Sequence, residues 1–399
     1  MSFEEVWPRL TALRSSESPD RTLAWKVLYG RRPQPLLLPV ADGRRGRAAI
    51  RFFVRSRRWR WWGRLLLSID RWMPDAGLLP EVHIDHFPVA TLFGEGAAST
   101  SIYVGSPGPL QKLTIMCPRH LDEPARVAKV SLHASADRAV AREAEWLRML
   151  AATPSTAGFV PRLLDDGTFS CGRRYLVMCA LPDGTTSLHF GHQHRAFLAA
   201  LADKGRSENW TVTTAVQRLH ERVRVVRCLL GDGHRQLFED GLEEVEAALA
   251  GRSLPGCLLH GDFAPWNVRL TPERVYVFDW EYAQSRGNPL QDFLHFHLMP
   301  RVLQSRRTRV GPAYMRALVQ RAADYAAAAF GADGGVAEAA GPLTIHYLLD
   351  TVSFYVEASG YMDARHPVMR AYLTLLERRH AWLPNAAEPL SVERIGYGR

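Results

Sequence analysis

The chain has 399 residues, 47% of them hydrophobic and 23% charged, which is typical of a soluble globular enzyme with two or three packed units. No apolar run approaches the ~20 residues that a membrane-spanning helix needs, and the acidic N-terminus lacks the pattern of a signal peptide. Five scattered cysteines without CxxC spacing argue against a disulfide framework and a zinc site, and they favour a cytoplasmic location.

The net charge of +9 is concentrated near the N-terminus, where residues 1–85 hold 16 Arg or Lys against 9 Asp or Glu. Residues 1–86 are therefore interpreted as a basic N-terminal extension. Its most distinctive stretch, residues 48–67, alternates arginines with tryptophans and ends in leucines.

Three interpretations of residues 48–67 compete. The favoured one is a strand and helix packed on the neighbouring domain, with arginine stems covering apolar surface. The second is peripheral contact with an anionic membrane or a glycolipid. The third, nucleic-acid binding, is disfavoured because no zinc-finger or RNP motif accompanies the basic residues.

Residues 87–181 are predicted to form a β-rich lobe. Its first strands are expected at three short runs: 89–93, 101–104 and 113–117. Small residues follow the first run and include Gly94, Gly96, Ser99 and Thr100. Such residues let backbone N–H groups approach a phosphate closely, and the two hydroxyls add donors. The alternative is an ordinary hairpin turn.

Lys129 lies in the next predicted strand, 126–132, between Ala128 and Val130. A lysine in this setting is typical of strands that reach the phosphates of ATP. A predicted helix over 137–151 follows, and Glu143 lies beside its apolar stripe, so it is expected to pair with Lys129. The alternative for this glutamate is a solvent-exposed charge.

A fully apolar strand, 175–181, ends the lobe in turn residues and leads to a predicted helical lobe, 182–399. The backbone from Cys179 to Leu181 is expected to hydrogen-bond an adenine. Six helices are expected in the second lobe: 195–204, 211–230, 233–250, 312–330, 335–359 and 367–380.

The central motif is His260-Gly261-Asp262, with Asn267 five residues after the aspartate and Asp279 twelve further on. Both aspartates follow apolar, strand-like runs. One carboxylate can accept the proton of a hydroxyl, while an amide oxygen and a second carboxylate oxygen can bind a hard cation. This combination suits phosphoryl transfer with Mg²⁺. His260 is predicted to be structural, and Asp292 is predicted to cap a helix or to hold this loop.

In this order the features resemble those of the aminoglycoside phosphotransferase and choline kinase superfamily, over residues 87–380. The resemblance implies an α+β, bilobal protein-kinase-like fold, with a β-rich N-lobe and a mainly helical C-lobe. It implies Asp262 as catalytic base and Asn267 and Asp279 as Mg²⁺ ligands. It also implies that Lys129, held by Glu143, contacts the nucleotide phosphates, under the loop that runs from Gly94 to Thr100.

The expected activity is that of a kinase dependent on ATP (or GTP) and Mg²⁺ that phosphorylates a hydroxyl of a small molecule or glycan. A basic chain without an acidic cluster in residues 183–399 suits a neutral or anionic acceptor better than a polycationic aminoglycoside. Such acceptors are sugars, polyols, amino alcohols and glycolipids. Two alternatives stay open: an inactive kinase-like scaffold and an antibiotic phosphotransferase.

Overall fold

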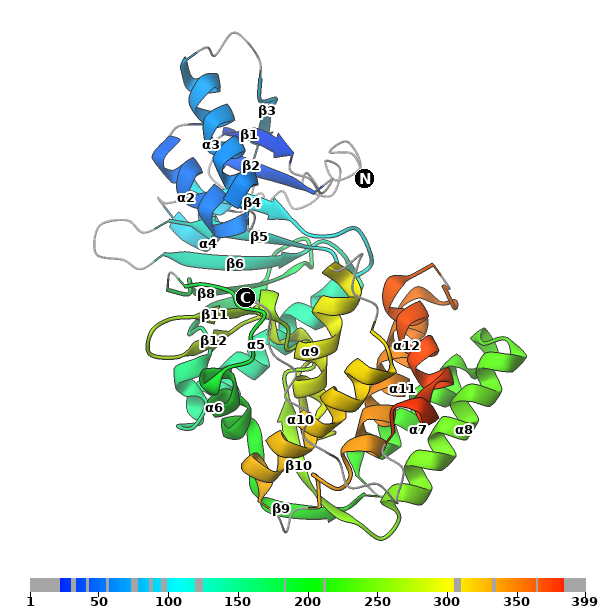
Figure 1. Cartoon of the computed structure of the whole chain (residues 1–399). Helices are drawn as coiled ribbons and strands as arrows, with labels where there is room; N and C mark the ends of the chain where they lie inside the picture. Colours follow the sequence, from blue (N-terminus) through cyan, green and yellow to red (C-terminus); the bar gives the residue numbers. More distant parts are fainter. Residues whose placement is uncertain are drawn as a thin grey trace. The chain divides into compact units, whose positions relative to one another are not determined.

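The computed structural model describes residues 22–29, 34–40, 43–54, 57–72, 78–85, 89–94, 99–118, 125–182, 184–210, 213–304, 310–331, 335–363 and 365–383. The chain divides into two compact units, residues 1–182 and residues 183–399. Their elements are labelled in Figure 1. Among the residues that the structure describes, no helix combines the length and the apolar character needed to cross a membrane.

The first unit is built on one antiparallel sheet of eight strands in the order β3-β1-β2-β4-β5-β6-β8-β7 (Figure 1). The strands are β1 Thr22–Tyr29, β2 Pro35–Pro39, β3 Glu81–Asp85, β4 Ser101–Val104, β5 Lys112–Cys117, β6 Arg126–Ser131, β7 Leu163–Thr168 and β8 Arg174–Cys179. Residues 1–86 were expected to form an extension, and three of their segments lie in this sheet.

A single apolar core joins the two halves of this sheet. Trp25 of β1 and Leu37 of β2 belong to the same buried cluster as Ile102 of β4 and Val130 of β6. The indole N–H of Trp25 donates to the carbonyl of Thr100 at 2.9 Å. Burial of apolar surface therefore holds β1 and β2 to the strands that follow them.

The described part of residues 48–67 lies, apart from Val54, in two helices, α2 Gly43–Phe53 and α3 Arg57–Trp72, rather than in the expected strand and helix. A Cβ atom on Gly46 would lie 2.9 Å from a methyl group of Leu67, and one on Gly63 would lie 3.1 Å from a methyl group of Leu28. The two glycines let α2, α3 and β1 approach closely. Helix α2 also contacts β2 and β4 of the same unit, whereas the favoured interpretation placed a strand and a helix on the neighbouring domain.

The strand expected at residues 89–93 is wrong, because these residues form the short helix α4, Val89–Phe93. Val89, Leu92 and Phe93 are all buried. Their spacing of three and four residues places them on one face of a helix, whereas a strand would turn them to both faces. The remaining helix of this unit, α5 Ala134–Ala152, packs against β6, β7 and β8.

The second unit is mainly helical, and all six expected helices are present, five of them with at least one shifted end. The helices are α6 His192–Leu201, α7 Thr214–Val226, α8 Asp232–Leu249, α9 Gln291–Gln304, α10 Pro312–Phe330, α11 Ala340–Ser359 and α12 Pro367–Glu377. Helix α11 packs against α7, α8, α9, α10 and α12. It is apolar along most of its length, as a helix surrounded by others must be.

Two small sheets lie among these helices. One has the order β13-β10-β9, formed by β9 Ala202–Asn209, β10 Ser253–Leu259 and β13 Gln284–Gly287. The other is the hairpin of β11 Val268–Leu270 and β12 Val275–Val277. The loops at the ends of β10 and β12 carry the residues of the central sequence motif.

Candidate active site

The loop after β10 turns sharply at Gly261. This residue has φ 83°, and a Cβ atom added to it would lie 2.4 Å from the carbonyl oxygen of Tyr282. Only glycine tolerates both the backbone conformation and the lack of space. The glycine between His260 and Asp262 is therefore required by the path of the chain.

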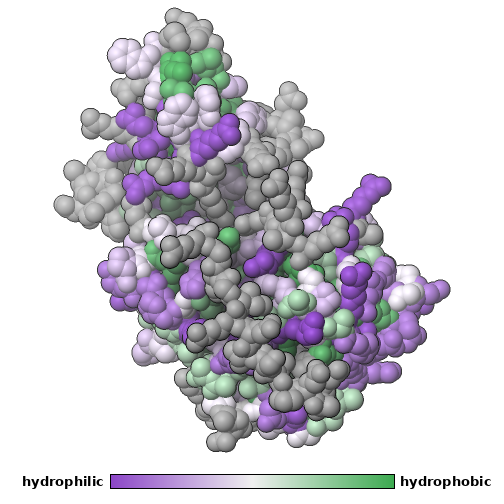
Figure 2. Space-filling view, in the orientation of Figure 1, coloured by the Kyte–Doolittle hydropathy of each residue, from purple (hydrophilic) through white to green (hydrophobic). Residues whose placement is uncertain are grey.

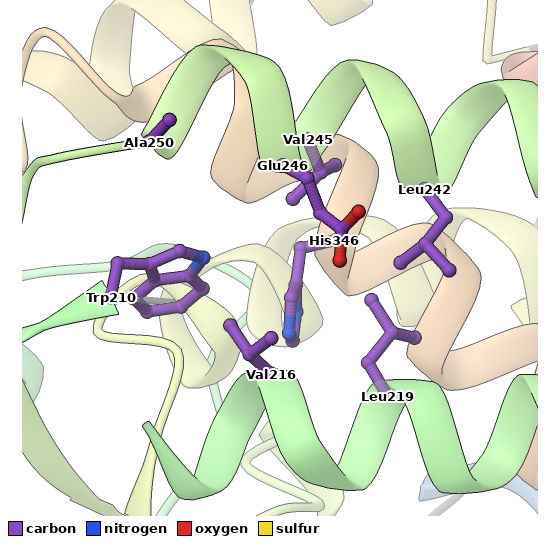
Figure 3. Close-up of a pocket in the computed structure, with 8 residues that line it drawn as sticks. All are labelled: Trp210, Val216, Leu219, Leu242, Val245, Glu246, Ala250 and His346. Carbon is purple, nitrogen blue, oxygen red and sulfur yellow. The ribbon is translucent and has the colours of Figure 1, made fainter. Parts of the chain in front are cut away.

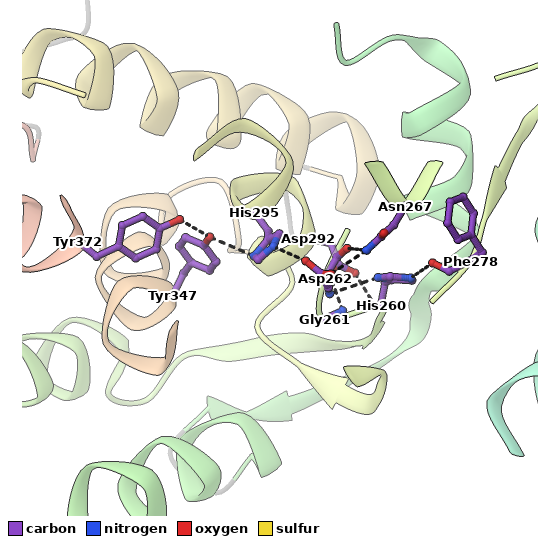
Figure 4. A network of polar contacts seen from close by, with 9 residues as sticks. All are labelled: His260, Gly261, Asp262, Asn267, Phe278, Asp292, His295, Tyr347 and Tyr372. Atoms are coloured by element: carbon purple, nitrogen blue, oxygen red, sulfur yellow. Dashed lines mark hydrogen bonds and ion pairs between the residues drawn. The ribbon is translucent and has the colours of Figure 1, made fainter. Parts of the chain in front are cut away.

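Asp292 holds this turn from the first turn of α9 (Figure 4). Its carboxylate accepts hydrogen bonds from the backbone N–H of His260 at 2.7 Å and from that of Gly261 at 3.0 Å. Burial raises the pKa of Asp292, while the two N–H donors and the neighbouring histidines act to lower it. The prediction that Asp292 ties down the loop is confirmed.

The ring of His260 links the two halves of the motif. Its Nδ1 accepts the backbone N–H of Asp262 at 3.2 Å, so the ring proton lies on Nε2, which donates to the carbonyl of Phe278 at 3.1 Å. The ring is fully buried. The loop after β10 is thereby tied to the residue that precedes Asp279, and the structural role predicted for His260 is confirmed.

Asp262 and Asn267 are in direct contact (Figure 4). The side-chain amide nitrogen of Asn267 donates to the Asp262 carboxylate at 2.7 Å and to the Asp262 backbone carbonyl at 3.0 Å. Both contacts use the nitrogen. The amide oxygen, the atom that a Mg²⁺ ion would bind, is therefore directed away from the aspartate.

Asp279 follows β12 in a left-handed conformation, with φ 74° and ψ 58°. Of the described residues other than glycine, it alone has a positive φ. Its predecessor Phe278 donates its backbone N–H to the carbonyl of Asn267 at 3.1 Å. Such a conformation costs energy for most side chains and is frequent at functional sites. The hairpin thus delivers Asn267 and Asp279 from its two ends.

His295 is a site residue that the sequence analysis missed. Its Nε2 lies 2.9 Å from the Asp262 carboxylate, on the oxygen that Asn267 does not contact. The available signal was its spacing from Asp292, three residues earlier on α9, which places both side chains on one face of the helix. One helix therefore contacts both the backbone of the loop after β10 and the side chain of Asp262.

Two tyrosines lie within the electric field of Asp262. Burial, followed by the charges of Glu281 and Asp262, raises the pKa of Tyr282. Burial and the charge of Asp262 raise the pKa of Tyr355 to about 12. Both phenols therefore keep their protons at neutral pH, and the ring of Phe354 contacts both of them.

In the first unit, the structure brings Lys129 and Glu143 together. The ammonium group of Lys129, on β6, lies 2.5 and 2.7 Å from the two carboxylate oxygens of Glu143, on α5. The glutamate is fully buried and Lys129 is 6% exposed, whereas Glu145 of the same helix is exposed. A charge pair at this depth holds the lysine in one position.

The small-residue loop is described only in part. Gly94 has φ 58°, and Gly96 lies outside the described residues. The Ser99 hydroxyl accepts a hydrogen bond from Arg45 of α2. Thr100 is fully buried, beneath Trp25. The Ser99 hydroxyl and the Thr100 carbonyl thus contact residues that precede the predicted lobe.

At the end of β8, two backbone N–H groups are already engaged. That of Cys179 donates to the carbonyl of Arg162 at 2.9 Å, and that of Ala180 donates to Ala125 at 2.8 Å. Leu181, the last residue of the predicted adenine contact, is partly buried. Adenine contacts in this stretch would therefore involve carbonyl groups and the backbone of Leu181.

The donor set suits a magnesium ion held mainly by phosphates. Within the described ranges, no three His, Cys, Asp or Glu side chains gather into a metal site. A site that uses one amide oxygen and one carboxylate, with phosphate oxygens and waters completing the shell, needs no such cluster. Asn267 and Asp279 fit that requirement.

A cavity of about 330 Å³ lies elsewhere in the second unit, between α7, α8 and α11 (Figure 3). It is lined mainly by apolar side chains, with the ring of His346 on one wall. Asn288 and the carbonyl of Ala215 occupy the two ring nitrogens of this histidine. The cavity contains none of the residues of the motif.

The first unit holds a buried lysine–glutamate pair on a strand and a helix. The second, helical unit holds an aspartate and an asparagine in contact on one loop. These features define a kinase-like phosphotransferase. The family model described as the phosphotransferase enzyme family, APH, matches residues 119–330. This match spans more than half of the chain, and the chain belongs to that family.

One solved structure supports the fold, and a second one was matched with a lower score. A thermostable mutant of aminoglycoside phosphotransferase APH(4)-Ia, in a ternary complex with ADP and hygromycin B, superposes with a TM-score of 0.50 at 14% identity. The alignment covers 75% of this chain and all of that one. Amicoumacin kinase hAmiN aligns over 70% of this chain and 88% of its own, with 11% identity and a TM-score of 0.46. No curated protein matches the sequence.

The bilobal α+β fold predicted from the sequence is therefore confirmed, with an antiparallel sheet in one lobe and helices in the other. The membership of the superfamily and the assignment as a phosphotransferase are confirmed as well. The identities are too low to transfer a substrate.

Proposed function

We propose that this phosphotransferase transfers the γ-phosphoryl group of ATP to a hydroxyl of a small molecule or glycan, with Asp262 as the base. The observation that carries the proposal is the fixed Asp262 carboxylate, which has a donor on each oxygen. In this class of reaction, catalysis consists mainly of positioning and electrostatic stabilisation. A carboxylate held by two donors meets the first requirement.

Asp262 orients the acceptor hydroxyl and accepts its proton. Asn267 and Asp279 hold the magnesium ions through the amide oxygen and the carboxylate. ATP supplies the phosphoryl group, and Mg²⁺ neutralises the charge that develops on it. His260 and Asp292 keep the loop in place without contact with the reacting atoms.

Lys129 contacts the nucleotide phosphates, and Glu143 keeps its ammonium group in position. Gly94, Gly96, Ser99 and Thr100 belong to the loop proposed to cover the phosphates. The backbone from Cys179 to Leu181 contacts the base, and either ATP or GTP suits backbone contacts. A nucleotide is supported by the ADP bound to APH(4)-Ia, which shares this fold.

The acceptor is proposed to be neutral or anionic and rich in hydroxyls. The chain carries a formal charge of +9, which disfavours a polycationic ligand on electrostatic grounds. The phenols of Tyr282 and Tyr355, whose pKa values the charge of Asp262 helps to raise, suit the oxygens of a sugar or polyol. The hygromycin B bound to APH(4)-Ia makes an aminoglycoside the competing acceptor to include in any test.

The test is a nucleotide-consumption screen over sugars, polyols, amino alcohols, glycolipid head groups and aminoglycosides, with Asp262→Asn alongside the native protein. Because a general base contributes about 10²- to 10⁴-fold, the variant should lose that much turnover while its ATP affinity stays unchanged. Asp324→Asn, on the exposed face of α10, is the matched control. Retained turnover in Asp262→Asn would refute the assignment.

Two further outcomes of the screen separate the rival functions. Nucleotide binding without turnover on every acceptor would favour an inactive scaffold protein. Turnover confined to aminoglycosides would favour an antibiotic phosphotransferase and contradict the argument from charge.

We further propose that the exposed face of α3 contacts an anionic membrane or glycolipid surface. Trp61 and Trp72 of this helix are 58% and 86% exposed, and Arg58 and Arg64 are exposed beside them. Over the position of α3, Figure 2 shows hydrophobic and hydrophilic residues side by side. Tryptophan prefers the membrane interface, and arginine adds attraction to lipid phosphates.

Sedimentation with vesicles tests this surface. Native protein should bind vesicles containing phosphatidylglycerol and bind neutral phosphatidylcholine vesicles much less. Binding to the anionic vesicles should weaken as the salt concentration rises. Arg58→Ala should weaken binding about fivefold, and Trp61→Ala should weaken it further. Leu188→Ala, at an exposed site of the second unit, is the control. Equal binding by the α3 variants and the native protein, or preference for an oligonucleotide over vesicles, would contradict the proposal.

A further inference from the structure

A buried chain of polar side chains runs from Asp262 into the helical core (Figure 4). His295 Nε2 lies 2.9 Å from the Asp262 carboxylate, and His295 Nδ1 lies 3.3 Å from the hydroxyl of Tyr347, on α11. That hydroxyl lies 2.8 Å from the hydroxyl of Tyr372, on α12. Both tyrosines are fully buried and His295 is 6% exposed.

The carboxylate of Asp262 only accepts, so Nε2 of His295 carries a proton. The hydroxyl of Tyr347 lies within hydrogen-bond distance of Nδ1, on the other side of the ring. The hydroxyls of Tyr347 and Tyr372 are hydrogen-bonded to each other. The ring of His295 is thus held at both nitrogens, which fixes its orientation.

We propose that His295 is a positioning residue for the catalytic base, and that Tyr347 and Tyr372 act through it by fixing its ring. This inference rests on the proposed role of Asp262. A hydrogen bond from Asn267 by itself would hold one carboxylate oxygen and leave the carboxyl group able to rotate about its bond to Cβ. With His295 on the other oxygen, the plane of the carboxylate is fixed, and the remaining lone pairs have a set direction.

This arrangement connects three helices to one carboxylate. Helix α9 contributes His295, α11 contributes Tyr347 and α12 contributes Tyr372. Buried hydrogen-bond chains of this kind make the group at their end more rigid than one bond would. Tyr347 and Tyr372 are fully buried, and neither the phenols nor the imidazole is assigned a step in the reaction.

The main test compares two substitutions of His295 in the full chain, with the acceptor that gives the highest turnover in the screen. His295→Phe keeps a ring and removes the donor, so kcat should fall on the order of 10²-fold while KM for ATP stays unchanged. His295→Gln places an amide N–H at a similar distance and should restore most of this loss. Native kcat in His295→Phe, or equal losses in both variants, would overturn the proposal.

A second comparison tests whether Tyr347 acts through His295. Tyr347→Phe removes only the hydroxyl and should lower kcat less than His295→Phe does. In the double variant, Tyr347→Phe should cause no further loss, because its effect passes through the histidine. Losses that multiply in the double variant would contradict that dependence.

The matched control is His297→Phe, the same substitution two residues further along α9. The ring of His297 packs against Phe190 and Phe293 and takes no part in this chain. Its kcat should equal that of the native protein. Thermal unfolding of each variant shows whether it folds.

Asp262→Asn separates this inference from the proposed function. If that variant keeps its turnover, the proposed function itself fails. If Asp262→Asn is inactive while His295→Phe is fully active, only the positioning role fails.

Discussion

The pair of Lys129 and Glu143 is the most deeply buried ion pair of the first unit within the described residues, with side chains 7% and 0% exposed. Removing one partner of such a pair leaves the other charge buried and uncompensated, which costs far more than the pair itself contributes. The glutamate therefore affects both the stability of the lobe and the position of the lysine.

Glu143→Gln should lower the free energy of unfolding by about 3 kcal/mol and weaken ATP binding, because the ammonium group loses its charged partner. Urea unfolding and nucleotide titration measure the two effects. Glu145→Gln, on the exposed side of the same helix, should change stability by less than about 0.5 kcal/mol. Similar behaviour of the two variants would contradict the assignment.

At the residue scale, contacts within one motif could be predicted from the spacing of its residues. Contacts between distant elements could not. The contact of Asp262 with Asn267 follows from a separation of five residues on one loop. The contact of Asp262 with His295 joins residues 33 apart on different elements, and only the packing of α9 creates it. Apart from its spacing from Asp292, a lone histidine in an apolar helix carries no signal of such a contact.

Among the elements, long helices were predicted well because a period of 3.6 residues repeats over several turns. Helix α10 was predicted at its observed ends, whereas α11 begins five residues later than expected. Helix α4 was missed because five residues span little more than one turn, and Val89 and Phe93 favour strands in isolation. Short elements depend on tertiary packing more than on their own periodicity.

The strands of the N-terminal segment show the same limit. β1 pairs with β2 and with β3, which begins more than fifty residues after β1 ends. β2 then pairs with β4 of the following lobe. Such pairing depends on partners far away in the sequence, so composition alone indicated a basic segment and left its sheet unrecognised.

At the scale of the whole molecule, buried histidines make stability depend on pH. Burial, followed by the charges of two neighbouring histidines, lowers the pKa of His194 to about 4. Burial lowers that of His346 to about 4 as well, against an opposing effect of Asp350. Both fall below the ordinary value near 6.5, so the folded state disfavours their protonation.

The protein should therefore have its full stability above about pH 6.5 and lose it as the pH falls toward 4, because the unfolded chain binds protons that the folded chain does not. At pH 5 the free energy of unfolding should fall by at most about 2 kcal/mol per histidine. Urea unfolding at pH 7.5 and pH 5 measures it. The loss should be smaller in His194→Phe and unchanged in His380→Gln, an exposed histidine of the same unit. Equal stability at both values of pH would contradict the expectation.

The continuous sheet of the first unit has a consequence for shortened versions of the protein. β4 is paired on one side with β2, through Leu36 with Tyr103 and Leu37 with Ile102. A chain starting at residue 87 would leave that side of β4 as a bare edge, with an apolar face no longer covered by Trp25. Bare edges of this kind recruit other chains and promote aggregation. β1 and β2 thus cover this edge and this apolar face of the family fold. The role of the N-terminal surface should therefore be studied with substitutions that leave the sheet intact.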